Sequence, residues 1–465
     1  MYIFDSVKKE KVEFVSLIPN VVTMYVCGPT VYDDAHLGHA RSALSFDMLF
    51  RTLRSLGYSV NFIRNFTDVD DKIIKKMQDS GKNLKEITEY YIQRYNEDMD
   101  ALNIMRPTIT PKATENIEAM QDMIKNLLAK NIAYKISNGD IYFDTSKDNL
   151  YGKLSNKVND ETLSRIESVS EKRSDKDFAL WKACNENDIV CFDASFGKGR
   201  PGWHIECSAM IEKHTKPTGG YSIDIHGGGA DLLFPHHENE ASQSRCATGH
   251  ELAKYWMHNG FVQIDGEKMS KSLGNSFFLK DTLKVYNGEI VRFYLSGIHY
   301  RNDFNFNEED LLNSKKRLDK LYRLKKRVFD ASASKPNVEF KKLLLEAMSD
   351  DLNISVALSL IDEMIAKSNE SLDVNINDKN AKKEIMANIE FINELLGFGY
   401  QDPFGYFQLG LDDKLVEKIN SLIKQRTEAK SQKNFALADK IRDELKEMDI
   451  NIMDTPNGTL WEKIS

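Results

Sequence analysis

Residues 21–66 have the pattern of a strand, a helix and a second strand, which limits the fold more than any other feature of the sequence. Residues 21–26 are apolar and rich in β-branched side chains, and a loop containing Gly28 follows. A helical spacing of apolar side chains then runs to Gly57, and residues 60–66 alternate as a strand does. A crossover of this length joins parallel strands, whose ligands bind beyond their carboxyl ends. We therefore predict an α/β fold with a site at the loop after the first strand.

Composition limits the class of protein but not its partner. The chain has 465 residues, enough for two to four domains, and its 41% hydrophobic and 29% charged content is typical of soluble globular proteins. The first residues lack the apolar core of a signal peptide, and we see no apolar run of about 18 residues, so we expect a cytoplasmic protein. The five cysteines are then expected to be free thiols or metal ligands. A net charge of −8 means that any RNA contact needs a local basic surface.

Two separated motifs are suited to binding nucleotide phosphates. In the first, Gly38 between His36 and His39 lets a phosphate approach the start of a helix, while the imidazoles can stabilise charge on an α-phosphate. In the second, Lys268 and Lys271 can neutralise the β- and γ-phosphates of a leaving group. Each motif also has a simpler interpretation: the histidines could only cap the helix, and the lysines could form a solvated basic loop.

Four further residues could hold a metal ion. Zinc prefers thiolate, imidazole and carboxylate ligands, and Cys27, Cys207, His236 and Glu240 supply these groups. His236 and Glu240 are four positions apart, so they share a face of a helix that we expect to begin near residue 235. From the residues alone, His237 remains an alternative to His236, and each cysteine could be a buried apolar side chain.

Three acidic residues follow the second predicted strand. Asp68, Asp70 and Asp71 could contact magnesium or substrate, but capping of the helix that starts near Lys72 is the preferred interpretation.

These motifs, together with longer runs, resemble bacterial cysteinyl-tRNA synthetases of class I over nearly the whole chain. The runs that carry the resemblance are 24–28, 36–39, 65–72, 202–210, 226–240, 268–272, 350–353 and 454–461. The family's first motif usually has isoleucine where this chain has Leu37, which is a conservative difference.

The resemblance implies both the reaction and the residues that perform it. The enzyme would form cysteinyl-adenylate from L-cysteine and Mg²⁺-bound ATP, then transfer cysteine to the terminal adenosine of tRNA-Cys. The implied assignments are a Zn²⁺ ion, one per chain, on Cys27, Cys207, His236 and Glu240; an amino-acid pocket at Thr67, Trp203 and His226; ATP contacts at Gly38, His39 and Lys271; and catalysis by His36, His39, Lys268 and Lys271.

Zinc would explain the selection of cysteine over serine, since steric differences of one atom give only about 1–3 kcal/mol. The metal prefers sulfur and lowers the pKa of a bound thiol. The substrate thiolate would either expand the zinc coordination to five or displace Glu240, and the sequence leaves both open. We expect no editing domain, no membrane association and a monomer.

The resemblance also suggests a division into domains. We expect a Rossmann-like catalytic domain in two parts (1–120 and 196–255) around an insertion (121–195). A region carrying the lysine motif and contacting the tRNA stem would follow (256–305), then a helical tRNA-binding bundle (306–400) and an anticodon-binding module (401–465).

The expected tRNA contacts are a basic helix and one aromatic residue. The basic residues are Lys315, Lys316, Arg317, Lys320, Arg323, Lys325, Lys326 and Arg327. They could equally form a solvated helix face. Trp461 could stack on an anticodon base or belong to the core of the terminal module.

Two alternatives to a synthetase remain. One is a ligase that joins cysteine to an amino sugar, which would not need the basic helix or the terminal module. The other is an inactive RNA-binding relative, which the intact histidines, lysines and metal ligands disfavour.

Overall fold

A computed structural model describes residues 1–156, 171–264, 267–268, 278–408, 412–455 and 458–463. The chain forms two compact units. Unit 1 contains Met1–Asp281, Leu295–Asn307 and Leu344–Ala357, and unit 2 contains Thr282–Tyr294, Glu308–Leu343 and Leu358–Ser465. Among the described residues, no helix is both long enough and apolar enough to span a membrane.

A four-stranded parallel sheet forms the centre of unit 1. Its order is β10 (Glu251–Asn259), β9 (Tyr221–Gly229), β3 (Val21–Val26) and β4 (Ser59–Arg64). The crossover between β3 and β4 is α1 (Leu37–Ser55). The predicted α/β fold with parallel strands is therefore confirmed.

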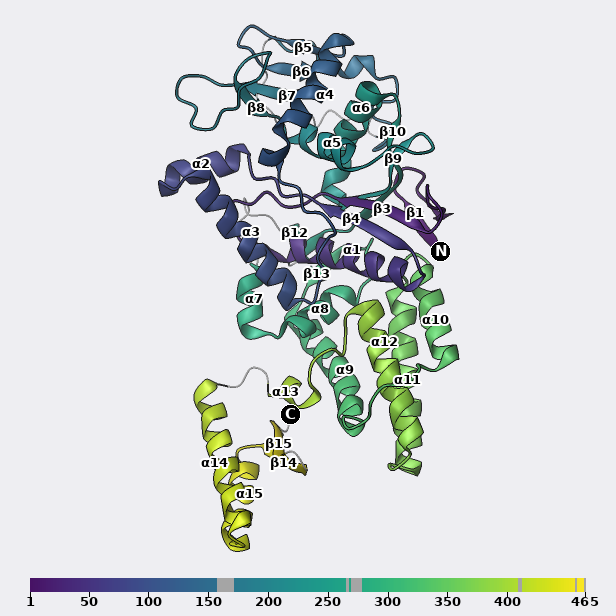
Figure 1. The fold of residues 1–465 in the computed structure, drawn as a ribbon, viewed down its shortest axis with the longest axis vertical. Coiled ribbons are helices and arrows are strands. Elements are labelled where there is room, and N and C mark those ends of the chain that lie inside the picture. Colours follow the sequence, from purple (N-terminus) through teal and green to yellow (C-terminus); the bar gives the residue numbers. More distant parts are fainter. Residues whose placement is uncertain (157–170, 265–266, 269–277, 409–411, 456–457, 464–465) are drawn as a thin grey trace. The chain divides into compact units, whose positions relative to one another are not determined.

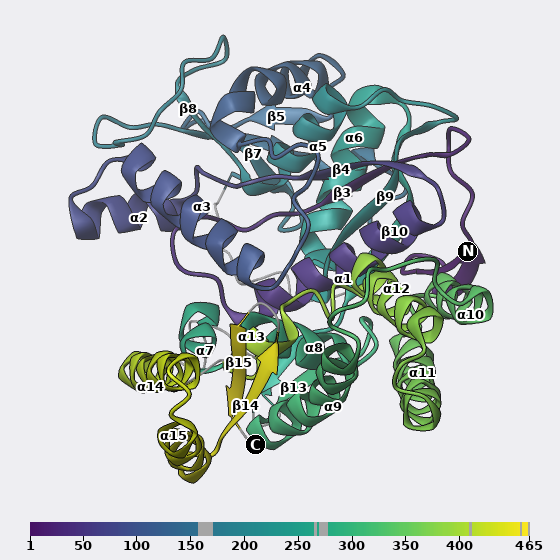
Figure 2. The ribbon, with the colours of Figure 1, turned by 60° about the horizontal axis from the view of Figure 1, so that its bottom comes forward.

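Helices cover both faces of this sheet. Figure 1 and Figure 2 show α1 on one face, with α5 (Trp203–His214) and α6 (Glu238–Thr248) on the other. The α5 side of the sheet has an apolar core that includes Tyr25, Ile63 and Met210, each fully buried.

The glycines at 227–229 occupy the end of β9. A Cβ on Gly227 would lie 2.2 Å from the ring of Phe46 on α1. Glycine is thus needed where the helix approaches the strand closely.

The insertion expected over 121–195 contains regular structure. It comes after α2 (Asp71–Ser80) and α3 (Leu84–Ala101) and begins within α4 (Ile117–Ala129). An antiparallel sheet then forms in the order β5 (Ala133–Lys135), β6 (Ile141–Phe143), β7 (Phe178–Ala183) and β8 (Gly199–Pro201).

Cys184 and Cys191 form a disulfide between β7 and β8. The prediction that all five cysteines are thiols or metal ligands is therefore wrong for this pair. Two contacts with the start of β8 bring these residues together. Cys184 N donates to Lys198 O, and Phe192, next to Cys191, forms an antiparallel bridge with Gly199. Cys27, Cys207 and Cys246 are free thiols.

Smaller elements complete unit 1. They are β1 (Tyr2–Asp5), β2 (Glu10–Glu13), β11 (Val262–Ile264), β12 (Glu267–Lys268), β13 (Phe304–Phe306) and the start of α7 (Leu279–Val285). The strand pair β11–β12 is antiparallel and leads into the lysine motif.

Unit 2 is largely helical. Its helices include α9 (Glu308–Arg327), α12 (Lys379–Leu396) and α13 (Pro403–Tyr406), while α8 (Gly288–Ser296), α10 (Val338–Ser349) and α11 (Ile354–Val374) each lie partly in it. The apolar side chains along α9 and just after it are buried, namely Leu311, Leu318, Leu321, Leu324 and Val328. The unit ends in α14 (Asp413–Ser431), α15 (Phe435–Glu447) and the hairpin β14 (Ile450–Thr455) and β15 (Gly458–Lys463).

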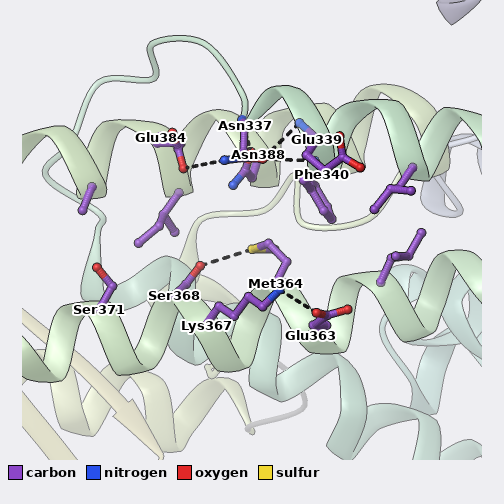
Figure 3. Close-up of a pocket in the computed structure, with 14 residues that line it drawn as sticks. Asn337, Glu339, Phe340, Glu363, Met364, Lys367, Ser368, Ser371, Glu384 and Asn388 are labelled. Atoms are coloured by element: carbon purple, nitrogen blue, oxygen red, sulfur yellow. Dashed lines mark hydrogen bonds and ion pairs between the residues drawn. The ribbon is translucent and has the colours of Figure 1, made fainter.

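A cavity of about 290 Å³ lies among α10, α11 and α12 in unit 2 (Figure 3). Glu363 and Lys367 form an ion pair with each other at its edge, and Asn337 contacts Glu384 and Asn388. None of the predicted site residues lines this cavity.

Candidate metal and nucleotide site

The parallel sheet brings several predicted site residues to its carboxyl edge. Cys27 directly follows β3, Thr67 lies just after β4, and His226 lies near the end of β9. The amide of Cys27 donates to Gly227 O at 3.1 Å, so the pairing of β3 with β9 continues to the edge. The βαβ pattern predicted this location.

The four predicted metal ligands lie within reach of one ion. Cys27 Sγ is 3.7 Å from Cys207 Sγ and 3.5 Å from Glu240 Oε1. His236 Nε2 is 3.8 Å from Cys207 Sγ and 2.7 Å from Glu240 Oε1. Cys207, His236 and Glu240 are at most 2% exposed, and Cys27 is half-buried. The geometry thus allows a common metal.

A second set of four donors overlaps the first. Cys27, His226, His237 and Glu240 also have ligand atoms within 4.8 Å of one another. In a tetrahedral zinc site with Zn–S distances of about 2.3 Å, two sulfurs lie about 3.8 Å apart. The Sγ–Sγ separation of 3.7 Å in the first set fits this value. The chemistry of the first set, with two thiols, also suits zinc better than that of the second, with one.

The helix that carries Glu240 begins later than predicted. α6 starts at Glu238, and His236 lies in the preceding turn, Leu233–His237. Phe234, with extended backbone angles, interrupts the helical geometry next to Pro235. The turn nevertheless keeps His236 beside Glu240, so the predicted i, i+4 contact forms.

The donor groups carry opposite charges that stabilise one another. A hydrogen bond from Cys27 lowers the pKa of Cys207 to about 6, while burial raises the pKa of Cys27. Burial opposes the charge on His236, but Glu240 and Cys207 outweigh it and raise the pKa of His236 to about 10. Burial likewise opposes ionisation of Glu240, but His236 and His226 hold its pKa well below the usual range. The charges of these groups are therefore coupled: Glu240 and Cys207 favour a protonated His236, and His236 favours an ionised Glu240.

Two further histidines orient this group, and the sequence analysis missed both. His204 Nδ1 lies 3.0 Å from His236 Nδ1, and His258 Nε2 lies 2.8 Å from His237 Nδ1. Burial lowers the pKa of His204 and of His258 to about 3, so both rings are neutral. His204 can then accept a hydrogen bond from the charged His236. Position near the carboxyl end of a strand was the signal that could have identified His258.

Two of the three predicted pocket residues contact the predicted metal ligands, and the third contacts Glu206. The ring of Trp203 stacks on His236 at a centroid distance of 4.1 Å and is 42% exposed. His226 Nε2 contacts Glu240 Oε2 at 2.6 Å. Thr67 Oγ1 donates to Glu206 Oε2 at 2.8 Å, a partner that the sequence analysis did not identify. Burial raises the pKa of Glu206 well above its usual range.

The first phosphate motif forms the start of α1. His36 Nδ1 accepts from the amides of Gly38 and His39, at 3.1 and 3.4 Å, and the His36 amide donates to His39 Nδ1. The two rings stack at 3.8 Å. This is the capping arrangement that was the simpler interpretation. A Cβ at position 38 would lie 2.8 Å from the His36 ring. Glycine is therefore required here by the position of the His36 ring, even without a bound phosphate.

The second phosphate motif can be followed only in part. Lys268 is the last residue of β12. The Lys268 side chain and the whole of Lys271 lie outside the part of the chain that the structure describes.

The three acidic residues have separate partners. Asp70 caps α2 by accepting from Lys72 N at 2.8 Å, as predicted. Capping is the wrong interpretation for the other two, because Asp68 accepts from Thr114 and Asp71 pairs with Lys182 and Arg200. Both carboxylates therefore bridge to later parts of the catalytic fold.

Trp461 is a core residue of the terminal module. It is 5% exposed, packs with Ile419 and Leu445, and donates from Nε1 to Asn420 Oδ1 at 3.0 Å. The suggestion that it stacks on an RNA base is therefore wrong. The same module exposes an aromatic side chain at the start of α15, because Phe435 is 63% exposed.

Many residues of the basic α9 helix have partners within unit 2. Ion pairs join Lys315 to Asp319, Arg317 to Asp362, Lys326 to Glu462 and Arg327 to Asp373. These contacts reduce the positive charge that α9 offers to an RNA phosphate.

Two protein families match separate parts of the chain. Residues 13–316 match the family of class I (C) tRNA synthetase catalytic domains, and residues 412–461 match the cysteinyl-tRNA ligase anticodon binding domain. The chain is 66% identical over 464 residues to a cysteine–tRNA ligase of Sulfurovum sp., and 57% identical over 465 residues to one of Helicobacter pylori strain G27. Each match covers all of both chains.

Solved structures of distant synthetases share the fold. Methionyl-tRNA synthetase of Mycobacterium tuberculosis, in complex with methionyl-adenylate, matches with a TM-score of 0.60 at 15% identity. That match covers 81% of this chain and 92% of the other. A leucyl-tRNA synthetase of Agrobacterium radiobacter K84 has a TM-score of 0.58 at 11% identity, with 86% of each chain covered. The chain belongs to the cysteine–tRNA ligases, a family of class I aminoacyl-tRNA synthetases.

Proposed function

We propose that this enzyme activates L-cysteine with Mg²⁺-bound ATP and transfers it to the terminal adenosine of tRNA-Cys, using one Zn²⁺ ion to select the thiol. The observation that carries the proposal is the convergence of two thiols, an imidazole and a carboxylate at the carboxyl edge of the sheet. When bound, Zn²⁺ would offer the substrate thiolate a ligand position that favours sulfur over the hydroxyl of serine.

Cys27, Cys207, His236 and Glu240 are the proposed ligands. Two thiols favour this set over the overlapping one, and His237 is better suited to support the site through its hydrogen bond to His258. Glu240 and Cys207 raise the pKa of His236, and metal ligands must be deprotonated, so metal binding would compete with protons at this ring. His204 would keep the His236 ring in place through its contact with Nδ1.

The remaining pocket residues would bind and orient the amino acid. Trp203 stacks on His236 and is 42% exposed, so it can cover bound substrate. Thr67, held by Glu206, would offer a fixed polar group to the amino acid. His226 would steady the Glu240 carboxylate.

ATP would bind at the start of α1. The amides of Gly38 and His39 already donate to His36 Nδ1, so an incoming phosphate would compete with this ring for them. His36 and His39 would then stabilise negative charge on the α-phosphate, with Lys268 and Lys271 supporting the departing pyrophosphate.

The tRNA would contact the region carrying the lysine motif (256–305), the helical bundle (306–400) and the terminal module (401–465). Phe435 is the proposed stacking residue in place of Trp461, since its ring is exposed and Lys433 lies close by in sequence. We further propose a monomer that acts in the cytoplasm, with the catalytic domain formed by 1–120 and 196–255 around the insertion at 121–195.

The test is transfer of labelled cysteine or serine to unfractionated tRNA by zinc-replete enzyme. We expect cysteine alone to be transferred. Cys207→Ser should abolish both zinc retention and charging, whereas Cys246→Ser, at a free thiol outside the ligand set, should preserve both. Cysteine-dependent ATP–pyrophosphate exchange without charging would instead favour a ligase with another acceptor.

A further inference from the structure

Two segments that carry the phosphate motifs are joined in unit 1. The amide of Leu279 donates to Ala35 O at 2.8 Å, and His36 forms an antiparallel bridge with Phe278. Lys280 Nζ lies 2.5 Å from Asp34 Oδ2. The residues directly before α1 are thus bound to the residues that follow the lysine motif.

Asp34 is the charged centre of this junction. It is 6% exposed, and its other oxygen lies 3.4 Å from Arg94 Nε on α3. Arg94 is itself held by Glu97 at 2.6 Å and by Asp98 at 3.7 Å. Asp34 therefore has a fixed cation on one side and Lys280, on the segment after the motif, on the other.

The burial of this pair distinguishes it from ordinary surface ion pairs. The Asp34 side chain is 8% exposed and that of Lys280 is 34% exposed. Shielding from water strengthens the attraction, and the hydrogen bond with Asp34 raises the pKa of Lys280. Removing Lys280 would leave a mostly buried carboxylate with only the longer contact to Arg94.

We propose that Asp34 is a positioning residue for adenylate formation, which acts by holding Lys280 beside the start of α1. The pair would fix the position of the chain just after the lysine motif relative to His36. The histidines of the first motif and the lysines of the second could then act on the same ATP molecule. The antiparallel pairing of β11 with β12 fixes the other end of the motif. This inference rests on the proposed roles of His36 and Lys271 in ATP binding.

The experiment compares Lys280→Met, Asp34→Asn and the double variant in cysteine-dependent ATP–pyrophosphate exchange. Loss of the pair should lower kcat/KM for ATP about tenfold, equivalent to about 1.4 kcal/mol. The KM for cysteine should stay within about twofold, as should transfer from preformed cysteinyl-adenylate to tRNA, because neither uses the pyrophosphate end of ATP. The double variant should resemble the stronger single variant, since the residues act as a unit.

Arg106→Met is the matched control. Arg106 forms an exposed ion pair with Asp100, which lies on α3, the helix that also carries Arg94. It should leave all parameters unchanged. The inference is overturned if folded Lys280→Met retains the parental kcat/KM for ATP, or if ATP use, cysteine use and transfer fall together with the melting temperature. If Asp34→Asn does not fold, Lys280→Met still decides the question. A parent enzyme inactive in exchange would instead overturn the proposed function and this inference with it.

Discussion

His226 holds the oxygen of Glu240 that His236 does not: His226 Nε2 lies 2.6 Å from Oε2, whereas His236 contacts Oε1. Both His226 and Glu240 are fully buried. Cys27 Sγ also approaches Oε1 at 3.5 Å, so His226 is the partner that holds Oε2. Removing a partner that orients a metal ligand usually lowers metal affinity by about 10- to 100-fold. We expect a loss of about this size when His226 is removed.

We therefore predict that His226→Ala weakens zinc binding by about 10- to 100-fold. Competition with a chromophoric chelator measures this directly, without relying on enzyme activity. His250→Ala is the control, because His250 pairs with Glu212 near the opposite end of β10. Unchanged zinc affinity in His226→Ala would mean that His226 acts on the substrate and not through Glu240.

Asp98 should destabilise the enzyme at neutral pH. Burial raises the pKa of this carboxyl to about 6, and its Oδ2 atom is buried without a hydrogen-bond partner. Because the folded pKa lies above the unfolded value, stability is lost as pH rises from about 4 to beyond 6, at most about 3 kcal/mol. Asp98→Asn should raise the melting temperature more at pH 8 than at pH 5.

The control for this prediction is Asp100→Asn on the same helix, whose exposed carboxylate pairs with Arg106. It should show no comparable gain at either pH. If Asp98→Asn lowers the melting temperature at both pH values, the contact with Arg94 outweighs the cost of burying the charge.

Phe435 should contribute to tRNA binding but not to cysteine activation. Stacking of a base on an aromatic ring contributes about 1–3 kcal/mol, so Phe435→Ala should lower kcat/KM for tRNA by about 5- to 150-fold. Cysteine-dependent ATP–pyrophosphate exchange should be unaffected. Steady-state charging at varied tRNA concentrations tests this. Val15→Ala is the control, because Val15 is 55% exposed and lies outside the regions proposed to contact tRNA. Equal tRNA kinetics in both variants would contradict the assignment.

The sequence was most informative where periodicity and geometry coincide. The strand–helix–strand pattern of 21–66 was enough to predict parallel strands. The i, i+4 spacing was enough to predict the contact between His236 and Glu240, although the helix itself begins at Glu238. Contacts between distant segments were not predictable. No pattern in the neighbouring sequence indicates that Thr67 contacts Glu206 or that His258 contacts His237. Trp461 shows the same limit: an aromatic residue in a charged segment can face RNA or the core, and only its packing with Ile419 and Leu445 decides.

Cysteine pairing is a further case that residue type and compartment did not predict. The structure joins Cys184 to Cys191 and leaves Cys27, Cys207 and Cys246 free. We therefore predict that maleimide labels three cysteines in enzyme denatured with a chelator but no reductant, and five after reduction, as measured by intact mass. The Cys184→Ser, Cys191→Ser double variant should give three labels under both conditions.

Loss of this disulfide should affect stability only moderately. A loop this short accounts for about 2–3 kcal/mol in the chain-entropy model. The backbone bond from Cys184 N to Lys198 O and the pairing of β7 with β8 hold the same connection independently. Reduction should therefore lower the melting temperature while preserving cysteine charging, because none of the proposed ligands lies in the connection. Five labels before reduction would show that the pair is present as thiols in the isolated enzyme.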